Sequence, residues 1–276
     1  MTLTEPSARI GTVVSPPVPR HLHSSLPHRL ADTIVRRRFA ITLTAVLLAL
    51  SAITQQVLAM GPLVSVDYAI HNLRFDLRYP QYYDAMLYLV MVGQRGPTAI
   101  PVLVIAAVLA RQLRSWRPLL LLGFALLALN GVVGVAKVFI ARALPSDNTA
   151  AVFVNNGIIF PSGHSSNVVV TWGIASYLLT RYGPIKRYDV GIAVTAMASL
   201  VVGVTSIYLD THWMTDIVAG WLIGAAILMV TIWLDQHFLA VSAKHRAPAV
   251  PLPRRVLPVR VAGKLPVHSG RQATRP

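Results

Sequence analysis

One histidine and one aspartate have a spacing that suits covalent chemistry. His212 and Asp216 are four residues apart, so one turn of a helix would stack them on the same face. A carboxylate in that position can hold one imidazole nitrogen as an N–H donor and leave the other nitrogen free to attack. Taken alone, the pair is better explained as a helix-capping ion pair.

Two further polar features lie upstream. The tetrapeptide Pro161-Ser162-Gly163-His164 has the composition of a turn that leads into a helix. The free N–H groups and the dipole of such a helix start would bind an anion. The alternative is that Ser162 is an ordinary helix N-cap. Lys137, alone, would be a lysine that extends toward a membrane interface. These features would favour a phosphate site only if all of them lie together on the same face of the membrane.

The composition shows where such a site would be. The chain has 276 residues, of which 54% are hydrophobic and 13% charged, against about 25% charged in soluble domains. Mean hydropathy is +0.58. There is no cysteine, which excludes disulfides and thiolate metal sites. The net charge of +15 does not indicate a nucleic-acid partner, because the basic residues lie in the tails and between apolar runs. That distribution indicates a membrane protein whose basic tails meet anionic headgroups.

The apolar runs predict an all-α, six-span transmembrane bundle. The segment Val64–Met91 mixes apolar and charged residues, so we expect an interfacial helix between the first two spans. Six runs are long enough to cross a bilayer: Phe39–Met60, about Val92–Leu113, about Pro118–Ala141, about Ser162–Thr180, Val190–Leu209 and His212 to about Leu234.

The chain divides into three parts. Both ends of the chain, residues 1–38 and 239–276, are rich in proline and basic residues. This composition predicts that both are disordered tails. Residues 39–238 form the membrane domain. Lys and Arg concentrate in both tails and in the connections after the second and fourth runs. The positive-inside rule therefore predicts a multi-pass protein of the cell membrane with both termini in the cytoplasm. Lys137, His164 and His212 would then share the extracytoplasmic face.

In order and spacing, these residues resemble the motifs of the type 2 phosphatidic acid phosphatase family. The family has a lysine followed seven and eight residues later by Arg-Pro, then Pro-Ser-Gly-His. Its third motif is Ser-Arg with a histidine six residues after the arginine and an aspartate four further on. Lys137, the tetrapeptide 161–164, His212 and Asp216 match this pattern. The resemblance covers roughly residues 39–238.

Two positions depart from the family pattern. Leu144 and Ser206 stand where the family has its motif arginines, which would hold phosphoryl oxygens. Loss of one such donor costs about 10²- to 10³-fold in rate. Arg142 and Arg95 are candidates for compensating charge. The simpler interpretations, which we favour at this point, are an interfacial arginine for Arg142 and a headgroup contact for Arg95.

The resemblance implies a mechanism without cofactor or metal. Lys137, Ser162 and the N–H groups near Gly163 would bind phosphoryl oxygens of a lipid phosphate. His212, oriented by Asp216, would become phosphohistidine, and His164 would protonate the leaving oxygen and then activate water. The implied function is a lipid-phosphate or polyprenyl-(pyro)phosphate phosphatase.

Three alternatives stay open: a phosphotransferase that uses the same site, a phosphatase-like lipid-binding protein with little turnover, and a transporter or channel. The last is disfavoured because no polar residues mark a midplane path. The sequence does not indicate an oligomeric state.

Overall fold

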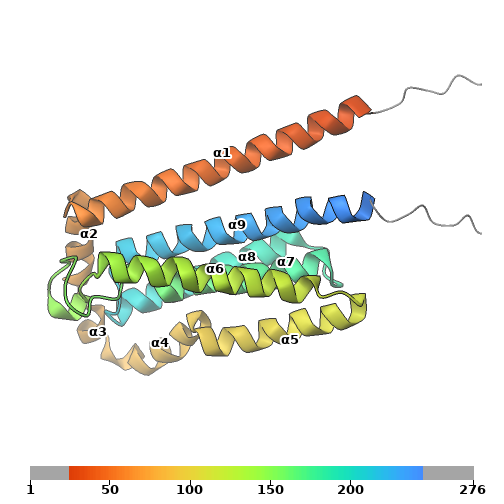
Figure 1. Ribbon diagram of the computed structural model, residues 1–276. Helices are drawn as coiled ribbons and strands as arrows, with labels where there is room; N and C mark the ends of the chain where they lie inside the picture. Colours follow the sequence, from red (N-terminus) through yellow and green to blue (C-terminus); the bar gives the residue numbers. More distant parts are fainter. Residues whose placement is uncertain (1–24, 245–276) are drawn as a thin grey trace, which may run out of the picture.

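The computed structural model describes residues 25–244 (Figure 1). Every element in this range is helical, which confirms the all-α prediction. The long helices are α1 (Ser25–Leu58), α5 (Arg95–Leu113), α6 (Arg117–Ile140), α7 (Gly163–Arg181), α8 (Tyr188–Tyr208) and α9 (Met214–Lys244). The short ones are α2 (Pro62–His71), α3 (Phe75–Arg78), η1 (Pro80–Tyr82), α4 (Tyr83–Val90), η2 (Met91–Gly93) and η3 (Pro145–Asp147).

Five described helices are long and apolar enough to cross a membrane, in agreement with a multi-pass membrane protein. They are α1, α5, α6, α8 and α9; the sixth long helix, α7, is less apolar. Helix α7 packs against α5, α6, α8 and α9, and most of its residues are buried. A helix enclosed by other helices needs no lipid-compatible surface, so α7 can carry more polar residues than the other five. The count of six spans therefore stays a prediction.

Close approach of α9 to α7 brings the two histidine-bearing segments together. A side chain at Gly220 would stand 2.7 Å from the Ser162 carbonyl oxygen, and one at Gly224 would stand 2.9 Å from that of Ser166. Small residues at such crossings let helix backbones pack closely inside a membrane. Apolar side chains of α5, α6, α7 and α9 form the two largest buried clusters of the core.

Three boundaries differ from the sequence-based expectations. Helix α1 begins at Ser25, so the expected tail is helical from there through Arg36–Arg38, and α9 continues to Lys244. The rest of both expected tails lies outside the described residues. The segment Val64–Met91 is a chain of short helices. It breaks where Arg74 adopts a left-handed conformation, with φ of 44°, and where Pro80 starts a new turn.

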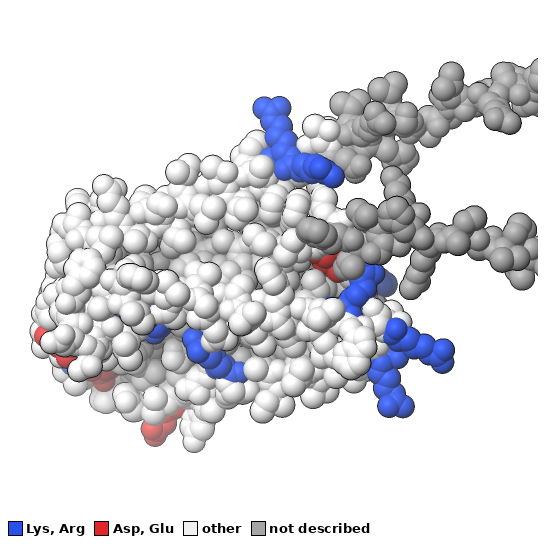
Figure 2. Space-filling view, viewed as in Figure 1, with Lys and Arg blue, Asp and Glu red and all other residues white. Residues whose placement is uncertain are grey.

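The two ends of the bundle differ in charge. The start of α1, the end of α9 and the α5–α6 and α7–α8 connections lie at one end, and α2 and α3 lie at the other (Figure 1). Lys and Arg side chains gather near the first end, and much of the surface between the ends is uncharged (Figure 2). The topology was predicted from this charge asymmetry. The assignment of the basic end to the cytoplasm stays a prediction.

Candidate active site

A cavity of about 590 Å³ opens at the N-terminal end of α7. Besides the start of α7, four other parts of the chain line it: the start of α5, the end of α6, the connection between α6 and α7, and the turn before α9. Among its lining residues are Arg95, Lys137, Gly163, His164 and His212. The structure therefore brings together most of the side chains that the sequence singled out.

Ser162 holds the start of α7. Its side chain is fully buried, and its Oγ accepts a hydrogen bond from the Ser165 backbone N–H at 3.3 Å. Its own N–H donates to the Asp216 carbonyl oxygen at 3.0 Å, which ties α7 to the start of α9. The hydroxyl thus has the position of the N-cap alternative. Phosphate binding by Ser162 remains a prediction, whereas Gly163 lines the cavity.

Two cations converge on Gly163. A Cβ atom built there would stand 3.8 Å from Arg95 Nη2 and 3.9 Å from Lys137 Nζ. Because Gly163 is the first residue of α7, both charges lie beside the free N–H groups of the helix start. Lys137 Nζ also donates a hydrogen bond to the Ile158 carbonyl oxygen. Two cations and a helix N-terminus are the groups that favour binding of an anion.

Helix α7 itself places Arg95. The buried Asn167 side chain donates to the Gly93 carbonyl oxygen and to Thr98 Oγ1, each at 3.0 Å. Thr98 Oγ1 in turn donates to the Gln94 carbonyl oxygen at 2.6 Å. These bonds fix the turn that starts α5, so the guanidinium lies at the cavity. Arg95 is thus a cavity-lining residue, a position that the headgroup contact favoured from sequence did not include.

His164 and His212 both line the cavity. Their ring centroids are 6.2 Å apart, with planes at 65°. His212 precedes α9, so it belongs to a turn and not to the expected helical stack. Its Nδ1 nevertheless lies 3.5 Å from Asp216 Oδ2 and has no hydrogen-bond partner among the described residues. With Nδ1 on the carboxylate side, Nε2 is the nitrogen available to the cavity.

Arg142 lies away from the cavity, in a fully buried cluster behind His212. Its Nη1 donates to Thr215 Oγ1 at 2.7 Å and to Asp216 Oδ1 at 2.5 Å, and its Nη2 donates to Asp67 Oδ2 at 2.7 Å. The structure therefore supports neither compensating charge in the pocket nor an interfacial arginine. Sequence reasoning missed Asp67 as a partner. The one feature of the sequence that could have pointed to Asp67 is that it is the single acidic residue of the largely apolar α2.

The two missing motif arginines are not equivalent in space. Leu144 lines the cavity and is 36% exposed. Ser206 is fully buried within α8, where its Oγ donates to the Val202 carbonyl oxygen at 2.7 Å. The positive charge that this chain lacks would thus stand mainly at position 144.

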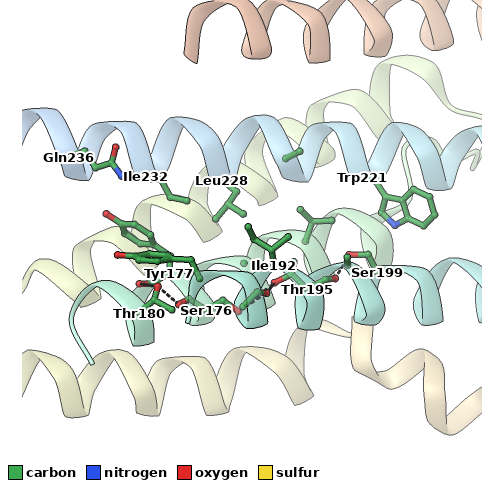
Figure 3. Close-up of a pocket in the computed structure, with 16 residues that line it drawn as sticks. Ser176, Tyr177, Thr180, Ile192, Thr195, Ser199, Trp221, Leu228, Ile232 and Gln236 are labelled. Carbon is green, nitrogen blue, oxygen red and sulfur yellow. Dashed lines mark hydrogen bonds between the residues drawn. The ribbon is translucent and has the colours of Figure 1, made fainter. Parts of the chain in front are cut away.

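A second cavity of about 530 Å³ lies between α7, α8 and α9 (Figure 3). Its lining is apolar apart from hydroxyl, amide and indole groups, and no Lys, Arg, His, Asp or Glu contributes to it. It therefore lacks the groups for phosphoryl chemistry. Within residues 33–237, whose side chains the structure describes, no three His, Asp or Glu side chains converge in a way that would hold a metal ion.

Comparison with solved structures identifies the fold. The structure titled "Crystal structure of the first transmembrane PAP2 type phosphatidylglycerolphosphate phosphatase from Bacillus subtilis" matches with a TM-score of 0.62 and 22% identity. The match covers 70% of this chain and 96% of that one. The long helices of this chain thus have the same overall fold as that transmembrane protein.

Sequence comparison gives the family. Residues 118–239 match the model of the PAP2 superfamily. Phosphatidylglycerophosphatase B of Bacillus subtilis (strain 168) is 23% identical over 175 residues, or 62% of this chain and 84% of that protein. Undecaprenyl-diphosphatase of Sulfolobus acidocaldarius is 30% identical over 77 residues, which are 28% of this chain and 34% of that protein. The resemblance inferred from the motifs is confirmed.

Proposed function

We propose that this protein is a lipid-phosphate phosphatase that acts through a phosphohistidine at His212. The observation that carries the proposal is the convergence of two imidazoles, two cations and a helix N-terminus on one cavity. The PAP2 family match and the phosphatases among the similar proteins support it. The lipid phosphate can be a phosphomonoester or a polyprenyl (pyro)phosphate.

The first step forms the covalent intermediate. Lys137, Arg95 and the N–H groups at Gly163 hold the phosphoryl oxygens, whose negative charge they balance. His212 Nε2 attacks phosphorus in line, an N–P bond forms, and the P–O bond to the lipid breaks. His164, in its protonated form, gives its proton to the departing oxygen. Asp216 lies on the Nδ1 side of His212, where it stabilises the positive charge that develops on the ring.

The second step releases phosphate. The now neutral His164 takes a proton from a water molecule that attacks phosphorus, and the N–P bond breaks. His212 returns to its starting form with its electron pair. No cofactor enters either step. Transfer to another hydroxyl in place of water would make the same site a phosphotransferase.

The apolar chain of the substrate needs a place beside the cavity. A groove of about 390 Å³ lies between α4, α5 and α7, and it is lined by apolar side chains that include Val92, Pro97, Ile105 and Trp172. Val92 and Pro97 flank Gly93–Gly96, which line the catalytic cavity. The groove therefore suits a lipid tail whose phosphate is held at Arg95.

The direct test is phosphate release from a panel of lipid phosphates by purified protein in detergent. The wild type should release phosphate, and His212→Ala should abolish release. His237→Ala is a matched control, because His237 lies near the opposite end of α9 and hydrogen bonds to the Trp233 carbonyl oxygen. Equal activity of His212→Ala and wild type would disprove the covalent mechanism. Lipid binding without turnover would favour the lipid-binding alternative, for which Leu144 in the pocket is the supporting observation.

We further propose that the cavity is extracytoplasmic and that both termini are cytoplasmic. The sequence has no cysteine, so a single introduced cysteine reports its own side. Asn156→Cys, in the connection beside the cavity, should react with a membrane-impermeant maleimide added to intact cells. Lys186→Cys, in the exposed α7–α8 connection, should react only after the membrane is opened. The reverse pattern would place the site on the cytoplasmic side.

A further inference from the structure

Helix α2 presents a polar face to the segments that carry the catalytic residues. Asp67 and His71 of α2 are buried, although the helix lies in the connection between α1 and α5. The Tyr68 hydroxyl accepts a hydrogen bond from the Ala150 N–H at 2.8 Å. His71 Nδ1 lies 2.8 Å from Asp210 Oδ1, and its Nε2 lies 3.2 Å from Asn148 Oδ1. One short helix thus contacts both the α6–α7 connection and the turn before His212.

The strongest of these contacts is made by Asp67. Its Oδ1 accepts the backbone N–H of Thr215 at 2.9 Å, and its Oδ2 accepts the Thr215 hydroxyl at 2.6 Å. Thr215 lies in the first turn of α9, so the carboxylate of one helix caps the start of another. An anion at a helix N-terminus is stabilised by the free N–H groups and by the helix dipole. Asp67 therefore fixes the start of α9 directly after the catalytic turn.

Arg142 joins Asp67 to Asp216. The guanidinium lies 2.7 Å from Asp67 and 2.5 Å from Asp216, and all three side chains are at most 1% exposed. The Trp213 indole packs on the guanidinium, with 5.4 Å from Cζ to the ring centroid. Charge-assisted bonds in a dry cluster hold their partners in defined orientations.

This arrangement divides the two oxygens of Asp216 between two tasks. Oδ1 accepts from Arg142, whereas Oδ2 accepts the Trp213 N–H at 3.0 Å and faces His212 Nδ1 at 3.5 Å. The orientation of the carboxylate toward His212 thus depends on Arg142, and Arg142 is held by Asp67. The cluster contains two carboxylates and one guanidinium, so one negative charge remains to face the imidazole.

From these contacts we propose that Asp67 and Arg142 are positioning residues for the His212–Asp216 pair. Through these contacts, α2 holds His212 in a fixed orientation and keeps a negative charge beside it. Neither residue lines the catalytic cavity, so neither touches the substrate. The inference rests on the proposed function for its consequence in turnover, while its effect on His212 can be measured without any substrate.

The substrate-independent measurement is the reactivity of His212 toward diethyl pyrocarbonate, an electrophile without phosphate or lipid chain. Peptide mass spectrometry gives the labelling rates of His212 and His164 in the same molecule, and their ratio cancels general changes in access. Asp67→Asn should lower the His212 to His164 ratio by roughly 3-fold or more, because Asp216 would no longer be held beside His212 Nδ1 and the other ring nitrogen would become a weaker nucleophile. Asp189→Asn is the control, since that carboxylate pairs with Arg187 in an exposed site at the other end.

The second readout is turnover of phosphatidic acid in detergent micelles. Asp67→Asn should lower kcat roughly 10-fold or more with KM within about 2-fold, because the altered group orients the nucleophile and does not bind substrate. Thr215→Val removes only a hydroxyl of the same cluster and should act in the same direction, which keeps the test open if Asp67→Asn misfolds. Arg142→Lys keeps the positive charge of the cluster, so its kcat should fall less than that of Asp67→Asn.

The two readouts separate the two claims. If the wild type releases no phosphate but Asp67→Asn still lowers the labelling ratio, the positioning role of Asp67 is upheld and the phosphatase is rejected. An unchanged labelling ratio in folded Asp67→Asn and Thr215→Val proteins would reject the positioning role, whatever the effect on turnover.

Discussion

Replacement of Arg95 by alanine is the sharpest perturbation of the phosphate site. Its Nη2 lies 3.8 Å from the Cβ position of Gly163, beside Lys137, while Leu144 and Ser206 stand where the family has arginines. Two unit charges about 4 Å apart interact by about 4 kcal/mol at an effective dielectric constant of about 20. Arg95 is exposed, so water screens part of this energy. The loss of one oxyanion donor, about 2.7 kcal/mol or roughly 10²-fold, is therefore the expected effect.

The assay is the steady-state kcat/KM for phosphate release from phosphatidic acid in detergent micelles. Arg95→Ala should fall roughly 10²-fold, and Arg95→Lys should fall less, because it keeps the charge but loses the forked geometry. Arg111→Ala is the matched control, since Arg111 lies at the opposite end of α5. An Arg95→Ala protein within about 3-fold of wild type, with Arg111→Ala unchanged, would refute the assignment of Arg95 as a phosphate ligand.

Three other predictions concern the same site, each checked by the same kinetic assay. Asp216→Asn should leave a fraction of the wild-type kcat, because His212 keeps its nucleophilic nitrogen but loses the charge beside Nδ1; a kcat equal to wild type would argue against that role. Ile105→Trp, which fills the groove beside the cavity, should raise KM for a long-chain lipid phosphate but not for a short-chain one, and equal changes for both would place the lipid tail elsewhere. Leu144→Arg should raise kcat/KM, because position 144 lines the cavity; a decrease would show that the pocket is not short of positive charge.

The helices and the cavity-lining motif residues could be predicted because their signals are local. Long apolar runs gave α5, α6 and α8 nearly at their observed bounds. The Pro-Ser-Gly-His tetrapeptide predicted a helix start, and α7 begins at its glycine. The run at about Ser162–Thr180 was predicted as a span, and α7 is less apolar than the candidate spans of the other five long helices, since a helix enclosed by protein is free to carry Ser166 and Asn167.

The roles of the two candidate arginines could not be predicted because they depend on distant partners. Arg142 is bound by Asp67 and Asp216, which lie 75 and 74 residues away in sequence. Asp67 is one of several charged residues in the segment Val64–Met91, and only the fold shows that it is buried. Arg95 faces the cavity because Asn167 of α7 binds the backbone at Gly93, a tertiary contact without a sequence pattern. Sequence spacing places residues along one helix, whereas these contacts join different helices.

The most direct test of the account is to trap the phosphorylated enzyme. Purified protein is mixed with a ³²P-labelled lipid phosphate and quenched within milliseconds in alkali, which preserves phosphohistidine but not phosphoserine. The account predicts one labelled peptide, which contains His212, and its absence from His212→Ala but not from His237→Ala. Phosphate release without any labelled peptide, or with the label on His164, would contradict the mechanism at its centre.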